Sequence, residues 1–126
     1  MTWDELVELA EGLGVRVIET DRLRGRAGLW ESVRRIVWIS CRPSAARRRA
    51  ALAHELGHVI CGHEGAQDEV GEAKADQVAA GLLISEREYV IAERLYDGST
   101  LGIAQELDVP TWVVEVYRDV LARRKM

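Results

Sequence analysis

The most constraining feature of this sequence is a helical segment that is apolar on all sides and yet carries ionisable groups. From Ala45 to about Cys61 the pattern is helical, and after Ala50 apolar residues fall on every face. A helix that is apolar all round belongs in the middle of a domain. His54, Glu55 and His58 lie inside this segment, and burying them without partners would cost several kcal/mol in sum. A bound metal ion at the centre of the fold would remove that cost.

The spacing of these three residues indicates zinc hydrolase chemistry. His54 and His58 are four residues apart, so on a helix they project from the same face about one turn from each other. Glu55 stands at the edge of that face, near enough to reach a metal-bound water. The pattern is the H-E-x-x-H of zinc hydrolases, in which zinc lowers the pKa of its water and the glutamate takes the proton. Because a bare H-E-x-x-H also occurs by chance, a third ligand must be found.

Three residues are candidates for the third ligand. Glu72 follows His58 by 14 residues, and Asp76 is four residues further on, so both carboxylates face the same way on the next helix. One can bind the metal while the other accepts the second N–H of a ligand histidine. His63 and Cys61 are the rivals, but His63 does not fit the register of a three-histidine site, and a rigid helix would hold Cys61 too far along. We therefore favour Glu72 as the third metal ligand. Asp76 would then accept the second N–H of a ligand histidine.

The rest of the chain predicts an α+β fold with a small three-stranded antiparallel sheet packed on a helical body. Short runs rich in β-branched and aromatic residues predict the strands, and breaks at glycine and proline separate the later helices. We expect a single domain, 1–126, in three parts: 1–43 with the first helix and the sheet, 44–84 with the metal-binding helices, and 85–126 with the C-terminal helices. The strands are predicted at Val15–Thr20, Leu29–Ser32 and Arg35–Ser40, and the helices near the N-terminus and at Ala45–Cys61, Asp68–Ile84, Ser85–Tyr96, Thr100–Leu107 and Thr111–Arg124.

Composition excludes several other classes of protein. The chain has 126 residues, 48% of them hydrophobic and 30% charged, with a net charge of −4. This balance suits a compact domain and does not favour a nucleic-acid or anionic-membrane partner, since both usually select a basic excess. There is no long apolar run and no basic N-terminal region of the secretory type. Cys41 and Cys61 do not form a disulfide framework, and we expect a soluble cytoplasmic protein.

Two segments together resemble a known family. The segment Ala53–His58 matches an A-H-E-x-x-H helix, and Glu72–Leu83 matches E-x-x-A-[ND]-x-x-A-x-x-L-L on the next helix. This combination resembles the ImmA/IrrE family of metallopeptidases, and the resemblance extends over roughly Gly28–Ser85. Two positions depart from the family pattern: Ser85 stands where proline often follows the two leucines, and Cys61 stands where an aliphatic residue is commoner.

The resemblance implies roles for the site residues. By similarity, His54, His58 and Glu72 would bind Zn²⁺, Glu55 would be the catalytic base, and Asp76 occupies the position of the family's Asn or Asp. It also implies a zinc-dependent endopeptidase of the phage or mobile-element type that cleaves a protein partner, such as a helix-turn-helix repressor or an antitoxin. The alternative is a metal-containing binding module that captures such a partner without cleaving it.

The C-terminal part of the sequence has a second pattern. Ile103–Pro110, followed by Val113, Val114 and Tyr117, is similar to a helix-turn-helix. A DNA-reading second helix would begin with basic or amide residues, whereas Glu115 near the start of this one would repel phosphate. We therefore expect these helices to pack on the catalytic core, with no direct nucleic-acid binding.

Overall fold

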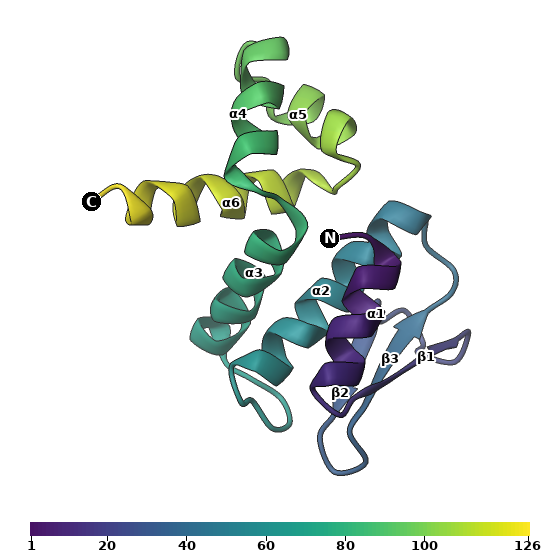
Figure 1. Ribbon diagram of the computed structural model, residues 1–126. Coiled ribbons are helices and arrows are strands. Elements are labelled where there is room, and N and C mark those ends of the chain that lie inside the picture. The colour runs from purple at the N-terminus through teal and green to yellow at the C-terminus, as the bar shows by residue number, and fades with distance from the viewer.

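The computed structural model describes residues 1–126 and contains six helices and three strands in the order of Figure 1. The predicted elements are all present, and each predicted boundary lies close to the observed one. The elements are α1 (Trp3–Gly12), β1 (Arg16–Thr20), β2 (Gly28–Glu31), β3 (Ile36–Ser40), α2 (Ala45–Ile60), α3 (Glu69–Leu83), α4 (Glu86–Leu95), α5 (Thr100–Leu107) and α6 (Thr111–Arg124). None of the helices combines the length and the apolar character that crossing a bilayer requires.

The sheet is mixed, and the prediction of a purely antiparallel sheet is wrong. The strand order is β1-β3-β2, with β1 parallel to β3 and β2 antiparallel to it. The chain reverses once through residues 21–27 and again in the tight turn between β2 and β3, so β3 runs in the same direction as β1. Because β3 then inserts between the two earlier strands, β1 pairs with it rather than with its sequence neighbour β2. The order of the strands in the sheet therefore makes one pair parallel, whereas a purely antiparallel sheet would need each strand to pair with its neighbour in sequence.

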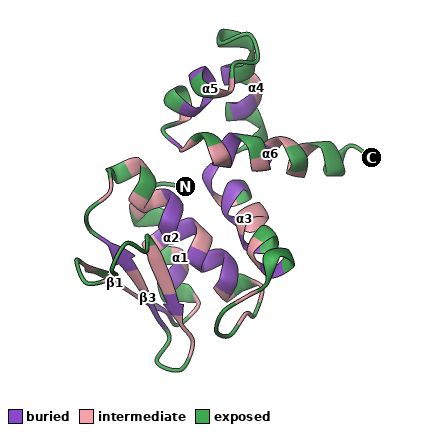
Figure 2. Cartoon of the chain, turned by 180° about the vertical axis from the view of Figure 1, so that it is seen from behind, coloured by how far each residue is buried: buried purple, intermediate pink, exposed green.

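Helix α2 lies at the centre of the molecule, as its all-round apolar pattern predicts. The hydroxyl oxygen of Ser44 accepts a hydrogen bond from the backbone N–H of Arg47 and so caps the first turn. Leu52 and Leu56 are fully buried between the sheet and the neighbouring helices. Figure 2 shows that α2 is mostly buried, whereas the end of α6 is exposed. A helix in this position can support a precise site, since packing fixes its side chains on all sides.

A glycine brings α2 and α3 into close contact. A Cβ atom on Gly57 would lie 2.5 Å from the backbone oxygen of Ala75, which no real contact permits. The facing side of α3 carries the small side chains of Ala75 and Ala79, both fully buried. These small residues let the two helix backbones approach each other, so that side chains of α3 can reach the histidines of α2.

Helices α4, α5 and α6 form a group above α3 in Figure 1, and α6 packs on α3. The guanidinium of Arg49, on α2, ties this group to the centre of the fold. It donates hydrogen bonds to the backbone oxygens of Leu107 and Asp108 in the turn between α5 and α6, and to that of Met1. The turn is thereby held close to the first half of α2, where it can contribute to a site on that helix.

Candidate metal centre

Three side chains from α2 and α3 converge on one point. The Nε2 atoms of His54 and His58 are 3.1 Å apart, and the Oε2 atom of Glu72 lies 3.0 Å from the first and 3.2 Å from the second. The two histidines meet because they are one helical turn apart on the same face of α2. Glu72 reaches them from α3, across the close approach at Gly57. The structure thus brings together the three residues for which the sequence predicts metal binding.

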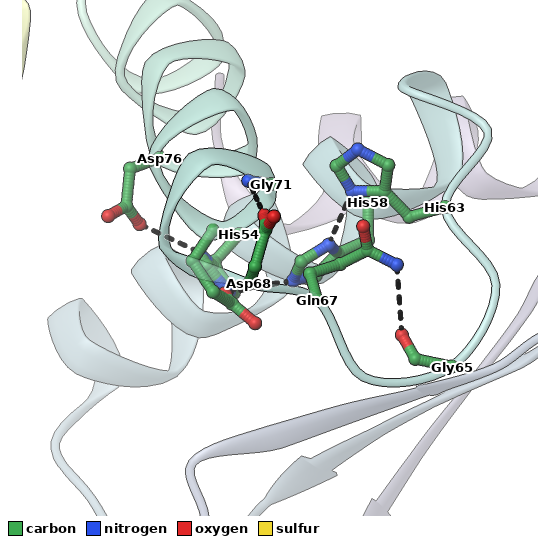
Figure 3. A network of polar contacts seen from close by, with 9 residues as sticks. His54, His58, His63, Gly65, Gln67, Asp68, Gly71 and Asp76 are labelled. Atoms are coloured by element: carbon green, nitrogen blue, oxygen red, sulfur yellow. Dashed lines mark hydrogen bonds and ion pairs between the residues drawn. The ribbon is translucent and has the colours of Figure 1, made fainter.

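The orientation of His54 is fixed by Asp76, which lies one turn after Glu72 on α3. His54 Nδ1 donates a hydrogen bond to the Asp76 Oδ1 atom at 2.8 Å, as Figure 3 shows. An ionised carboxylate can only accept, so Nδ1 carries the hydrogen and Nε2 keeps a free lone pair. That lone pair points to the place where His58 and Glu72 meet. The predicted part of Asp76, to accept the second N–H of a histidine, agrees with this geometry.

His63 lies behind His58 and not beside the converging atoms. Its Nδ1 atom is 2.9 Å from the Nδ1 atom of His58, which is the ring nitrogen on the far side from Glu72. The Nε1–H of Trp30 donates to the backbone oxygen of His63 at 3.0 Å and holds this loop against the sheet. His63 therefore supports the ring of His58, and Cys61, the other rival, does not belong to the converging group.

The arrangement fits a tetrahedral metal ion. Ligand atoms that lie about 2.0–2.2 Å from one tetrahedral zinc ion are about 3.3–3.6 Å from each other, and the three observed separations, 3.0–3.2 Å, are slightly shorter. Two imidazole nitrogens and a carboxylate oxygen meet here, and all three atoms are groups that bind a metal cation. The Glu72 side chain is 46% exposed, so the site is open to solvent, as a catalytic metal site must be.

Glu55 lies beside this group and is almost completely buried. Its side chain packs against β2: a Cβ atom on Gly28 would come within 2.9 Å of the Glu55 Cγ atom. Burial raises the pKa of Glu55 to about 7, and the charge of Glu72 raises it as well, whereas His54, the backbone of Trp30 and Arg26 lower it. A carboxyl group with a pKa near neutrality can both take up and release a proton at physiological pH.

The two histidines differ in their proton affinity. Burial lowers the pKa of His54, but its hydrogen bond to Asp76 and the charges of nearby carboxylates outweigh burial, so the net pKa is raised. The pKa of His58 is lowered, by burial first and then by the neighbouring His54. A neutral imidazole is the form that binds a metal, and the surroundings of His58 favour that form.

Two features of the site were missed in the sequence. One is Gly28, whose lack of a side chain lets the edge strand β2 lie directly on Glu55. The other is a cavity of about 620 Å³ beside His54 and Glu55, walled partly by α5 and the start of α6. The sequence places Gly28 in the connection before the predicted strand Leu29–Ser32, and the cavity walls from α5 and the start of α6 are 46 or more residues from Glu55 in the chain. No local pattern could have indicated either.

A family model described as Peptidase_M78, IrrE N-terminal-like domain, matches residues 10–116. A search of curated proteins gives no significant match. Among solved structures, a Mycobacterium tuberculosis transcriptional regulator is similar in fold, with a TM-score of 0.68, 16% sequence identity and coverage of 88% of this chain and 39% of that chain. The chain thus spans about two fifths of the regulator's length, and identity at this level shows the fold alone.

Proposed function

Since the chain belongs to the Peptidase_M78 family of IrrE N-terminal-like domains, we propose that it is a zinc-dependent endopeptidase that cleaves a protein partner. The observation that carries the proposal is the convergence of His54, His58 and Glu72 within 3.0–3.2 Å, with the buried carboxyl group of Glu55 beside them. In this proposal the first three residues bind the metal and Glu55 is the general base.

When bound, zinc supplies a Lewis acid that polarises the scissile carbonyl and acidifies water. The chain's own residues supply the proton transfers and the orientation. Glu55 takes the proton of the attacking water and returns it to the nitrogen of the leaving amine, a task that suits a carboxyl group with a pKa of about 7. Asp76 keeps the lone pair of His54 Nε2 directed at the metal position, and His63 supports His58 from the other side.

We further propose that the substrate is a transcriptional repressor or an antitoxin. Two things support this: the resemblance of the metal-binding helices to the ImmA/IrrE family, whose members act on such proteins, and the likeness in fold to a protein described as a transcriptional regulator. A repressor acts in the cytoplasm, which is the compartment expected for this chain. The exposed Glu115 on α6 argues against direct contact with phosphates.

The experiment that tests the proposed activity uses a matched pair of variants. Purified protein, loaded with one equivalent of Zn²⁺, is incubated with a mixture of denatured β-casein and a proteome-derived peptide library, and new N-termini are identified by mass spectrometry. We expect cleavage by the wild type, and loss of cleavage by at least a hundredfold in Glu55→Gln. The control Glu64→Gln removes an exposed carboxylate on the loop after α2 and should cleave as the wild type does.

The same experiment separates the peptidase from the alternative, a binding module that captures its partner. Zinc content is measured in both variants by elemental analysis. If Glu55→Gln keeps its zinc and cleaves as well as the wild type, Glu55 is not the general base; if the wild type cleaves nothing, the peptidase assignment is wrong. In the second case, capture of a repressor without cleavage becomes the function to pursue.

A further inference from the structure

Seven of the thirteen residues that line the cavity beside Glu55 are hydrophobic. It has a volume of about 620 Å³, within the range of about 300–1,000 Å³ typical of sites that enclose small ligands. Alanines on facing helices make the room, because a larger side chain at Ala50, Ala51 or Ala104 would fill it. We call it the apolar cavity; its remaining walls are Ala27, Arg47, His54, Glu55, Leu101, Gln105, Val109, Pro110, Thr111 and Trp112.

The side chains that line this cavity favour the binding of an apolar side chain. Leu101, Val109 and the indole of Trp112 offer carbon surface, whereas polar groups come from Arg47, His54 and Glu55 on α2, Gln105 on α5 and Thr111 on α6. Burial of a large aliphatic or aromatic side chain here would remove apolar surface from water, which favours binding. A charged side chain would find no partner among the walls contributed by α5 and α6.

A second depression, next to the first, is strongly basic. It has a volume of about 580 Å³ and is lined by four arginines, with Asp21 as its one acidic residue. The four arginines are exposed and form no ion pair within the chain, although the protein as a whole carries a net charge of −4. We call this depression the arginine hollow; its arginines are Arg24, Arg26, Arg42 and Arg47.

The two depressions adjoin each other, and Glu55 lines the first of them. Ala27 and Arg47 line both of them, and Glu55 lies at the wall of the apolar cavity next to Ala27. An extended segment that fills both depressions therefore passes the position where a peptide bond would be cleaved.

We propose that the substrate of this site is a polypeptide segment with a large apolar residue next to the scissile bond and acidic residues a few positions away. The apolar side chain fills the apolar cavity, and the acidic side chains pair with the arginine hollow. The inference rests on the proposed peptidase function and specifies its substrate class. Charge complementarity supports it, because four unpaired arginines attract carboxylates and repel basic segments.

The test measures binding and cleavage separately. Fluorescently labelled twelve-residue peptides are prepared with Leu or Ala at the centre and with Glu, Gln or Lys at two positions on one side, in both orientations. Binding is measured by anisotropy with zinc-loaded Glu55→Gln protein at low and high salt, and cleavage is measured with the wild type. We expect the Leu–Glu peptide to bind about tenfold more tightly than the Ala–Glu peptide and about three- to tenfold more tightly than the Leu–Gln peptide, with the second difference shrinking in high salt.

Matched variants assign each preference to its depression. Arg42→Glu should remove the preference for Glu over Gln, whereas Arg22→Glu, the same change on an exposed arginine outside the hollow, should keep it. Leu101→Glu places a charge in the wall of the apolar cavity and should remove the preference for Leu over Ala. Leu95→Glu is its control, since Leu95 is 63% exposed and Leu101 is 59% exposed, but only Leu101 lines the cavity.

The outcomes distinguish the proposed peptidase function from the proposed substrate class. Cleavage with no preference among the peptides overturns the substrate class and supports the peptidase function. Selective binding with no cleavage by the wild type overturns the peptidase and supports the two depressions as a peptide site. Absence of both overturns both. If a twelve-base-pair DNA duplex binds and Arg42→Glu abolishes that binding while no peptide is preferred, the arginine hollow recognises phosphate and the inference is wrong.

Discussion

Burial of the Glu55 carboxyl group should make the stability of the metal-free protein depend on pH, and Glu55→Gln should remove that dependence. Glu55 is only 8% exposed, so its ionised form loses most of its hydration in the folded state. The uncharged amide of glutamine has nearly the same shape and carries no such penalty. The comparison therefore isolates the cost of a buried charge at the centre of the candidate site.

The sign and size of the pH dependence of the free energy of unfolding follow from the raised pKa of Glu55. The folded state holds the pKa of Glu55 at about 7, whereas the ordinary value is 4.5. Between these values the folded protein binds more protons than the unfolded chain, so the free energy of unfolding falls as the pH rises. The contribution of protonated Glu55 to the free energy of unfolding is fully present below pH 4.5. It is lost as the pH rises to about 7, and the loss amounts to about 3 kcal/mol.

The assay is urea unfolding of chelator-treated wild type and Glu55→Gln at about pH 5 and about pH 8. We expect the variant to be more stable than the wild type at the higher pH, and the difference between them to shrink by about 2–3 kcal/mol at the lower pH. His54 and His58 titrate in both proteins, so most of their contribution cancels in the comparison. A stability difference that is the same at both pH values would refute the reasoning.

Three further predictions concern the surroundings of the site. Gly57→Ala should lower the free energy of unfolding by about 1–3 kcal/mol, because its Cβ atom would lie 2.5 Å from the backbone oxygen of Ala75; an unchanged melting temperature would contradict this. Asp76→Ala should weaken zinc binding about 10–100-fold in competition with a chelator, and equal affinity would show that the carboxylate does not orient the histidine. Arg49→Ala should lower stability by about 1–3 kcal/mol and speed amide hydrogen exchange in the turn between α5 and α6, and unchanged exchange there would show that the turn is held by other contacts.

The elements of the fold could be predicted because their signals are local. Ser44 is a capping residue at the start of α2, and Gly62 follows that helix in a left-handed conformation. The run Ile36–Ser40 is β-branched and aromatic, as a buried strand requires. The mixed pairing of the sheet could not be predicted. Whether β1 pairs with β2 or with β3 depends on which strand lies in the middle of the sheet. That order is set by packing across the whole sheet, and the alternation of residues within each strand does not indicate it.

The H-E-x-x-H segment and the Glu72–Asp76 pair were determined by the sequence alone, because helical geometry converts a spacing of four residues into a shared face. The sequence also determined that α2 is central, since a helix that is apolar on every face is stable only when every face is buried. Only the tertiary structure decided that α3 approaches α2 closely enough for Glu72 to reach both histidines, and that His63 lies behind His58. It alone placed residues at the α5–α6 turn in the wall of the cavity that Glu55 lines, and the arginine hollow next to that cavity. These are contacts between residues far apart in the chain, and they depend on how the elements pack rather than on what each element is.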